Sequence, residues 1–180
     1  MGIRSWEIDP SWTLFLDRDG VINRRIFGGY VRNFSEFHFH EGVCEALKKA
    51  KHCFARIIVV TNQQGVAKGI MTASELSELH DTMQTEIMRA GGKIDAVFAA
   101  VEWAEEQPSR RKPSPAMGLE AKALFPEINF EKAIMVGDTD SDLAFGQALS
   151  MKTVLIKSEE KVNRIPDEIV SSLYDLIQQV

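Results

Sequence analysis

The chain has few cysteines, no long apolar run and no excess of positive charge. Its two cysteines, Cys44 and Cys53, lie in or next to one predicted helix, so no disulfide framework is expected and a reducing cytosol fits. The apolar runs are too short to span a membrane, and the N-terminal residues contain no apolar segment of a secretory signal. The formal net charge of -5 argues against binding a nucleic-acid backbone through bulk charge. We therefore expect a cytoplasmic protein that binds neither membrane nor nucleic acid.

The remaining composition is that of a globular protein. With 180 residues, 44% hydrophobic and 26% charged, the chain is long enough for one sizeable core and too short for two ordinary domains. It contains no internal repeat, low-complexity segment or interdomain linker. We expect residues 1–180 to form a single domain.

Short apolar runs alternate with segments of helical periodicity. We expect strands at 13–16, 57–60, 94–100, 133–136 and 153–156. We expect helices at 42–51, 72–91, 114–125 and 140–149, and a last helix that Asp167 caps and that runs through Ile177. This alternation predicts an α/β fold with a Rossmann-like, doubly wound parallel sheet between two layers of helices.

Two carboxylates follow the first predicted strand. Residues 14–23 read LFLDRDGVIN, so Asp17 lies at the tip of the strand and Asp19 comes two positions later. The carboxyl ends of strands in open α/β sheets border ligand sites. Two carboxylates at this spacing can divide the work, because one can attack while the other handles a proton. Many solvated turns also contain Asp-x-Asp, so the rest of the chain must decide its meaning.

Three further polar motifs follow other predicted strands: TNQQG at 61–65, RRKP at 110–113 and GDTDSD at 137–142. If the strands are parallel, these side chains converge on the two carboxylates. Asp17 and Asp138 would supply the hard oxygen ligands that Mg²⁺ prefers. The carboxylate of Asp17 could then attack a phosphate monoester, and Asp19 would protonate the leaving oxygen. Thr61 and Lys112 would stabilise charge on the phosphoryl oxygens.

Together these motifs, with GYV at 29–31, resemble the haloacid dehalogenase (HAD) superfamily of phosphohydrolases. They are most similar to its branch of heptose bisphosphate and histidinol-phosphate phosphatases, over residues 12–157. The resemblance implies the HAD fold without a large cap domain, a Mg²⁺ cofactor and a small phosphorylated metabolite as substrate. A heptose bisphosphate is the first expectation and histidinol phosphate the second, with another sugar phosphate or a nucleic-acid 3′-phosphate as further alternatives. The missing cap suggests a monomer.

The resemblance also implies roles for individual residues. The catalytic residues would be Asp17, Asp19, Thr61 and Lys112. The metal ligands would be Asp17, Asp19 through its backbone carbonyl, Asp138 and Asp142, while Asp140 would cap the following helix. The substrate would contact Arg18, Gly29, Tyr30, Asn62, Gln63, Gln64 and Arg111. Arg24 and Arg25 would either contact a second phosphate or lie exposed.

One segment departs from the pattern of this branch. Many members carry a zinc loop of three cysteines and a histidine just before Arg-Lys-Pro, but residues 99–110 contain neither residue type. They cannot form that tetrahedral site, so zinc is not expected. We expect Trp103 to replace the metal cross-link with apolar packing.

Two other classes of protein share parts of this constellation. A signalling receiver domain also surrounds an aspartyl-phosphate with acidic residues, a hydroxyl and a lysine, but it stores the phosphoryl group. Asp19 argues against storage, because an acid two residues beyond the nucleophile promotes hydrolysis. A non-catalytic binding module on the same fold would be expected to lack one of the motif residues. This chain has all five of them: Asp17, Asp19, Thr61, Lys112 and Asp138.

Overall fold

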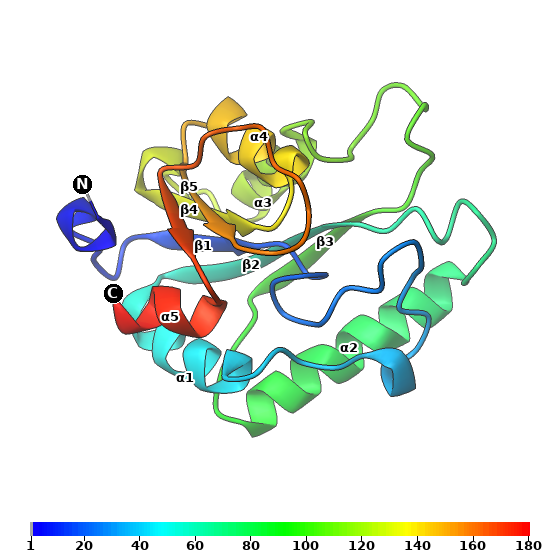
Figure 1. Ribbon diagram of the computed structural model, residues 1–180, viewed down its shortest axis with the longest axis horizontal. Helices are drawn as coiled ribbons and strands as arrows, with labels where there is room; N and C mark the ends of the chain where they lie inside the picture. The colour runs from blue at the N-terminus through cyan, green and yellow to red at the C-terminus, as the bar shows by residue number, and fades with distance from the viewer. Residues whose placement is uncertain (1) are drawn as a thin grey trace.

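Six parallel strands form one sheet in the computed structural model, which describes residues 2–180 (Figure 1). The strands are β1 (Thr13–Leu16), β2 (Arg56–Asn62), β3 (Ala96–Ala100), β4 (Ala133–Gly137), β5 (Lys152–Ile156) and β6 (Glu168–Val170). Their order is β3-β2-β1-β4-β5-β6, which confirms the doubly wound arrangement. The order reverses beside β1, and the carboxyl ends of β1 and β4 flank the crevice where such sheets bind ligands.

Five α-helices cover the sheet: α1 (Val43–Cys53), α2 (Ala73–Arg89), α3 (Ala116–Leu124), α4 (Asp140–Ala148) and α5 (Leu173–Gln178). In Figure 1, α1, α2 and α5 lie on one face and α3 and α4 on the other, so the predicted three layers are present. Single 3₁₀ turns are Ile3–Trp6, Phe34–Glu36 and Phe130–Lys132. Among residues 2–180, no helix has the length and apolar character needed to cross a bilayer.

Strand side chains alternate between two hydrophobic cores. Leu14 and Leu16 of β1 pack in the core shared with α1, α2 and α5, whereas Phe15 packs with α3 and α4. This alternation follows from the two-residue repeat of a strand. Because both faces are covered, all four residues of β1 are buried, and the strand can hold Asp17 at a fixed place.

The predicted last helix is wrong at its start. Asp167 does not cap a helix; its carboxylate instead accepts hydrogen bonds from the Thr153 backbone N–H at 2.8 Å and hydroxyl at 2.9 Å. This contact aligns β6, which the sequence did not reveal, along β5. The helix begins only after Ser172, whose side chain accepts a hydrogen bond from the backbone N–H of Asp175. A short edge strand has too few residues to show periodicity of its own.

The predicted cap of α4 is also wrong. Thr139 is the N-cap, and the Asp142 carboxylate bonds back to it in a capping box. The Asp140 carboxylate points instead to a distant loop, where it accepts hydrogen bonds from the backbone N–H groups of Asn163 at 3.0 Å and Arg164 at 2.8 Å.

Candidate active site

The turn after β1 packs directly on the turn after β4. The backbone N–H of Asp17 donates to the carbonyl of Val136 at 2.9 Å, which joins the two strand ends. Gly20 has a φ of +92°, and a Cβ there would lie 2.2 Å from Oδ2 of Asp138. Only glycine fits both the left-handed backbone and this close approach. The turn therefore brings the two predicted metal ligands together.

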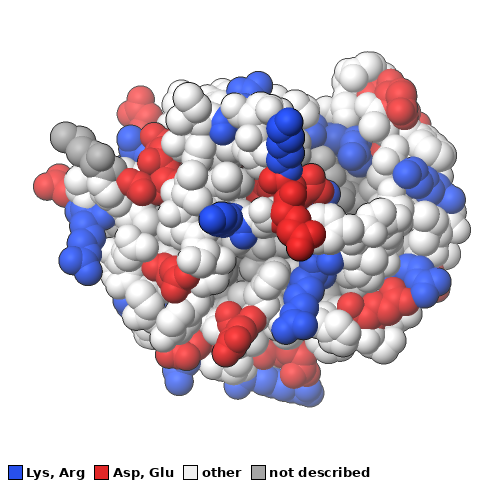
Figure 2. Space-filling view, viewed as in Figure 1, with Lys and Arg blue, Asp and Glu red and all other residues white. Residues whose placement is uncertain are grey.

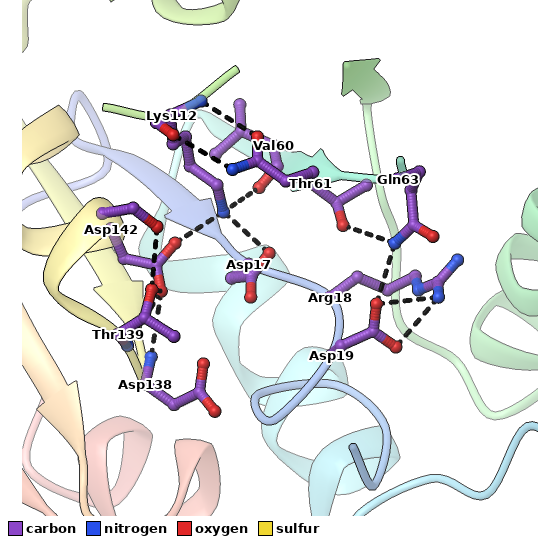
Figure 3. Close-up of polar contacts among 12 residues, drawn as sticks. Asp17, Arg18, Asp19, Val60, Thr61, Gln63, Lys112, Asp138, Thr139 and Asp142 are labelled. Atoms are coloured by element: carbon purple, nitrogen blue, oxygen red, sulfur yellow. Dashed lines mark hydrogen bonds and ion pairs between the residues drawn. The ribbon is translucent and has the colours of Figure 1, made fainter. Parts of the chain in front are cut away.

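Three carboxylates gather at this edge of the sheet (Figure 3). Asp17, Asp138 and Asp142 each offer an oxygen, and these oxygens lie within 4.8 Å of one another. Oδ1 of Asp138 is buried and has no hydrogen-bond partner among the described residues. A buried carboxylate oxygen is costly to leave unpaired. The donor set of hard oxygens and this unpaired atom fit a magnesium ion.

Asp142 is already engaged by protein groups. Its Oδ2 accepts hydrogen bonds from the Thr139 hydroxyl at 2.7 Å and from the backbone N–H of Asp138 at 3.2 Å. Its Oδ1 lies 2.6 Å from Nζ of Lys112. One side chain thus holds both the turn that carries Asp138 and the buried lysine, and direct metal contact by Asp142 stays a prediction.

Lys112 is buried against two carboxylates. Its Nζ lies 2.7 Å from Oδ1 of Asp17 and donates to the Val60 carbonyl at 2.7 Å (Figure 3). Burial opposes the charged ammonium, but the carboxylates of Asp142 and Asp17 prevail and raise the pKa of Lys112 above its ordinary value. The lysine therefore stays charged in the site.

Burial and crowding raise the pKa of two of the acids. Burial, and next the repulsion from neighbouring carboxylates, raise the pKa of Asp17 to about 7, although Lys112 opposes this. Burial and the nearby Asp142 raise the pKa of Asp138 to about 6. Such shifts are typical of functional sites, because like charges have been brought together without full compensation.

The carboxyl end of β2 and the residue that follows it contribute a hydroxyl and amides rather than charge. Thr61 is buried, and its hydroxyl accepts a hydrogen bond from Nε2 of Gln63 at 2.8 Å. The same Nε2 donates to Oδ2 of Asp19 at 2.8 Å. Asn62 clamps the backbone of Lys112 on both sides, accepting from its N–H at 2.9 Å and donating to its carbonyl at 3.1 Å. This clamp presents Lys112 to Asp17.

Most of the groups described above line a cavity of about 420 Å³; Asp138 does not line it. The cavity is lined by the predicted site residues Asp17, Asp19, Gly29, Tyr30, Thr61, Asn62, Gln63, Gln64, Arg111, Lys112 and Asp142, together with Arg25, Phe27, Lys68 and Glu160 among others. The Tyr30 ring packs against Gly65, where a Cβ would meet it at 3.1 Å, and Nζ of Lys68 lies 5.4 Å from the ring centre. Nη1 of Arg111 is buried without a partner among residues 2–180. The cavity lining thus combines the aromatic ring of Tyr30 with the cationic side chains of Lys68 and Arg111.

Arg25 lines the cavity, 3.2 Å from Asp138 and 3.4 Å from Glu160, so its contact with a second phosphate stays a prediction, whereas Arg24 is exposed. Two other predictions about individual residues need correction. Arg18 cannot bind substrate, because it is fully buried and points away from the cavity. Trp103 is 42% exposed and does not replace a zinc cross-link, since the base of its loop is held instead by the Glu102 carboxylate, which accepts a hydrogen bond from the backbone N–H of Arg110.

Some residues of the site were not predicted from the sequence. Glu160 belongs to the loop after β5, which has no recognisable motif. His80 lies behind Arg18 on the buried face of α2, where only its position among apolar residues could have drawn attention.

Charged side chains of both signs are intermixed on the face shown in Figure 2, without a continuous basic surface there.

Comparison with known proteins identifies the relatives of this fold. A family model described as HAD-hydrolase-like matches residues 109–176. D-glycero-alpha-D-manno-heptose-1,7-bisphosphate 7-phosphatase of Mycobacterium tuberculosis is 40% identical over 132 residues, which are 73% of this chain and 70% of that protein. D-glycero-beta-D-manno-heptose-1,7-bisphosphate 7-phosphatase of Helicobacter pylori is 33% identical over 84% of this chain and 86% of its own length.

A solved structure shares the fold over nearly the whole chain. The D,D-heptose 1,7-bisphosphate phosphatase from B. bronchiseptica, complexed with magnesium and phosphate, superposes with a TM-score of 0.84. It is 22% identical and is covered to 97%, while 93% of this chain is covered. The sequence relatives and this shared fold agree with the resemblance of the motifs. The chain therefore belongs to the HAD-like hydrolases, in the branch that contains the heptose bisphosphate phosphatases.

Proposed function

We propose that the chain is a Mg²⁺-dependent phosphatase that hydrolyses D-glycero-D-manno-heptose 1,7-bisphosphate through an aspartyl-phosphate on Asp17. The observation that carries this proposal is the pair Asp17 and Asp19 on one cavity, with Nζ of Lys112 2.7 Å from the first carboxylate. A nucleophile, a second acid and a fixed cation within one cavity suit phosphoryl transfer, in which positioning and charge stabilisation provide most of the catalysis.

In the first step, the carboxylate of Asp17 attacks phosphorus, and the bond from phosphorus to the sugar oxygen breaks. In its protonated form, Asp19 gives a proton to that oxygen, so a neutral alcohol leaves. In the free site, burial is outweighed by the charge of Arg18 and by hydrogen bonds from Arg18, Asn23 and Gln63, which lower the pKa of Asp19, so the acid must gain its proton before this step. In the second step, Asp19 takes a proton from water as the water attacks phosphorus, which frees Asp17 and inorganic phosphate. Lys112 and the Thr61 hydroxyl stabilise charge on the phosphoryl oxygens in both steps.

Asp17 and Asp138 would hold the magnesium ion, with Asp19 contributing its backbone carbonyl. When bound, the ion neutralises the phosphoryl charge that would otherwise repel an anionic nucleophile. Arg25 lies beside Asp138 and restrains this carboxylate from the side of the cavity.

Magnesium binding should weaken as the pH falls. The pKa of Asp17 is raised to about 7 and that of Asp138 to about 6. Below these pH values, the two proposed ligands are mostly protonated in the metal-free protein. The metal must then displace a proton, and the apparent affinity should fall roughly tenfold per pH unit for each proton displaced. Isothermal titration calorimetry with Mg²⁺ between about pH 5 and about pH 8 measures this. An affinity that does not change over that range would contradict it, and Asp138→Asn, the control, should bind weakly at every pH.

The proposed substrate has two phosphates, and the cavity has cations in two places. Lys112 lies at the nucleophile, whereas Arg111 and Lys68 lie at the rim. The unpaired Nη1 of Arg111 suits a second phosphate, because a guanidinium binds phosphate oxygens in a fixed fork. The M. tuberculosis relative is named for the alpha anomer and the H. pylori relative for the beta anomer, so both anomers belong in the test.

A substrate panel tests the proposed function. Phosphate release is measured with Mg²⁺ on heptose 1,7-bisphosphates of both anomers, histidinol phosphate, other sugar phosphates and a 3′-phosphorylated oligonucleotide. We expect one heptose bisphosphate to have the highest kcat/KM. Arg111→Met should reduce this value by about tenfold or more, as expected for a charged hydrogen bond, and leave 4-nitrophenyl phosphate hydrolysis nearly unchanged. Arg89→Met, at an exposed position of α2, is the matched control.

Two results would overturn the proposed function. Higher kcat/KM on histidinol phosphate would assign that substrate instead. Labelling of Asp17 without turnover on any compound would favour a phosphoryl-storing receiver domain. The proposal also includes a monomer in the cytoplasm, and sedimentation equilibrium checks the oligomeric state.

A further inference from the structure

A buried histidine lies behind the proposed acid/base, outside the cavity. His80 is 7% exposed and belongs to the inner face of α2, together with Leu76, Leu79, Met83 and Ile87. The proposed chemistry does not use it. A histidine on an apolar helix face can be a packing residue, so its polar contacts decide what it does.

The imidazole of His80 contacts Arg18. Its Nε2 lies 3.1 Å from Nη1 of Arg18, which is fully buried. A guanidinium has only donors, so Nε2 must be the acceptor and the ring proton must be on Nδ1. Burial, and next the charge of Arg18, lower the pKa of His80 to about 3, which agrees with a neutral ring.

Arg18 in turn holds the carboxylate of Asp19. Its Nη2 donates to Oδ1 at 2.9 Å and to Oδ2 at 2.8 Å (Figure 3). The guanidinium is planar, so fixing Nη1 also fixes the direction of Nη2. Asn23 and Gln63 each donate one further hydrogen bond to the same carboxylate. Each amide anchors one of the two oxygens, whereas Arg18 is the only described residue that donates to both.

We propose that His80 is a positioning residue for the acid/base Asp19 and acts through the Arg18 guanidinium. This inference rests on the proposed phosphatase activity. Nε of Arg18 is already buried without a partner among residues 2–180. Without a neutral acceptor at position 80, Arg18 would bury a second unpaired N–H group or turn to find another partner. Either outcome moves Nη2 and therefore the carboxylate that must reach the leaving oxygen. Shifts of this kind are costly in catalysis even when the fold persists.

The leaving group separates positioning from general packing. A sugar oxygen needs a proton to leave, and Asp19 supplies it. By contrast, 4-nitrophenolate leaves without a proton, so the first step with this substrate depends little on the position of Asp19. The second step needs Asp19 for both substrates, so the comparison uses kcat/KM, which reports only the steps up to departure of the leaving group. Loss of His80 should therefore reduce kcat/KM far more on the sugar phosphate than on 4-nitrophenyl phosphate.

The test compares His80→Leu, His80→Gln and the exposed control His52→Leu on both substrates. We expect His80→Leu to reduce kcat/KM on the sugar phosphate roughly 10- to 100-fold, a part of the usual contribution of general acid–base catalysis. The loss of kcat/KM on 4-nitrophenyl phosphate should be below about threefold, because its first step needs no proton. His80→Gln should restore most of kcat/KM on the sugar phosphate, since its Oε1 can accept from Arg18.

Equal losses on the two substrates, or no rescue by glutamine, would overturn the inference and leave His80 as a packing residue. If the wild-type protein hydrolyses neither substrate, the proposed function fails instead, and the two failures can be distinguished. Nitrogen NMR of the wild-type protein gives a test that does not depend on a variant that folds. A neutral ring protonated on Nδ1 is expected, and a ring protonated on Nε2 would overturn the inference.

Discussion

Asp17→Asn should abolish phosphate release, with a loss of about 10⁴-fold or more on the best substrate. An amide oxygen is too weak a nucleophile to form the phosphoryl intermediate, and the other groups cannot replace it. Asp19 is turned toward Arg18, Asn23 and Gln63. Phosphate release measures the loss, and a denaturation-trapped phosphoprotein should be present in the wild type and absent in the variant.

The same substitution should stabilise the metal-free fold at high pH. Burial raises the pKa of Asp17 to about 7 in the folded state, well above the ordinary value of an aspartate in an unfolded chain. The folded state therefore binds the proton more tightly, so this contribution to stability is lost as the pH rises through 7. Asp17→Asn removes that loss, which we expect to be roughly 1 to 3 kcal/mol at about pH 8 and to shrink below about pH 6.

Thermal and urea unfolding in the presence of a chelator check this stability change. Asp81→Asn, at an exposed position of α2, is the control and should change neither activity nor stability. Residual activity of Asp17→Asn within about tenfold of wild type would remove Asp17 from the role of nucleophile. A variant less stable than wild type at high pH would contradict the electrostatic explanation but not the chemical one.

Lys112→Met should damage both activity and stability. Nζ of Lys112 lies 2.7 Å from Asp17 and 2.6 Å from Asp142, and all three side chains are buried. Removing one partner of a buried ion pair leaves uncompensated charge, so the free energy of unfolding should fall by about 3 kcal/mol. The phosphoryl group also loses its fixed cation, which should reduce kcat/KM by about 10²- to 10³-fold.

Magnesium should distinguish the two parts of the Lys112 effect. The ion brings positive charge to the same carboxylates, so it should restore part of the lost stability but little of the activity. Unfolding with and without Mg²⁺ and initial rates of phosphate release measure these quantities. Lys48→Met on the exposed side of α1 is the matched control. Full activity of Lys112→Met would show that the lysine only neutralises the acids.

The parts of the site that could be predicted from the sequence are those near strand ends. Asp17, Thr61 and Asp138 directly follow or end apolar runs, and parallel strands bring such positions to one edge without knowledge of any side-chain contact. The direction of a side chain is a different matter. Arg18 lies between two site residues, yet it turns into the protein because His80, 62 positions away in the chain, provides a buried acceptor.

Long-range contacts also explain the other errors. Asp140 and Asp167 both look like helix caps, because aspartate before a helical segment usually is one. Each binds instead to backbone or side-chain groups more than a dozen residues away, at Asn163 and Thr153 respectively. The local preference of aspartate for the N-cap is outweighed by hydrogen-bond partners that are distant in sequence and become neighbours only in the folded chain. Glu160 shows the same limit, since nothing in its loop marks it as part of the cavity.

The double engagement of Asp142 has an evolutionary consequence. One of its oxygens holds Lys112, and the other holds the turn that carries Asp138. Substitutions at positions 112 and 142 are therefore expected to depend on each other, although 29 residues lie between the two positions in the sequence. Loss of Lys112 alone leaves the buried charge of Asp142 without its cation, and loss of Asp142 alone removes one of the two carboxylates that hold Lys112, so we expect the two positions to change together within a lineage.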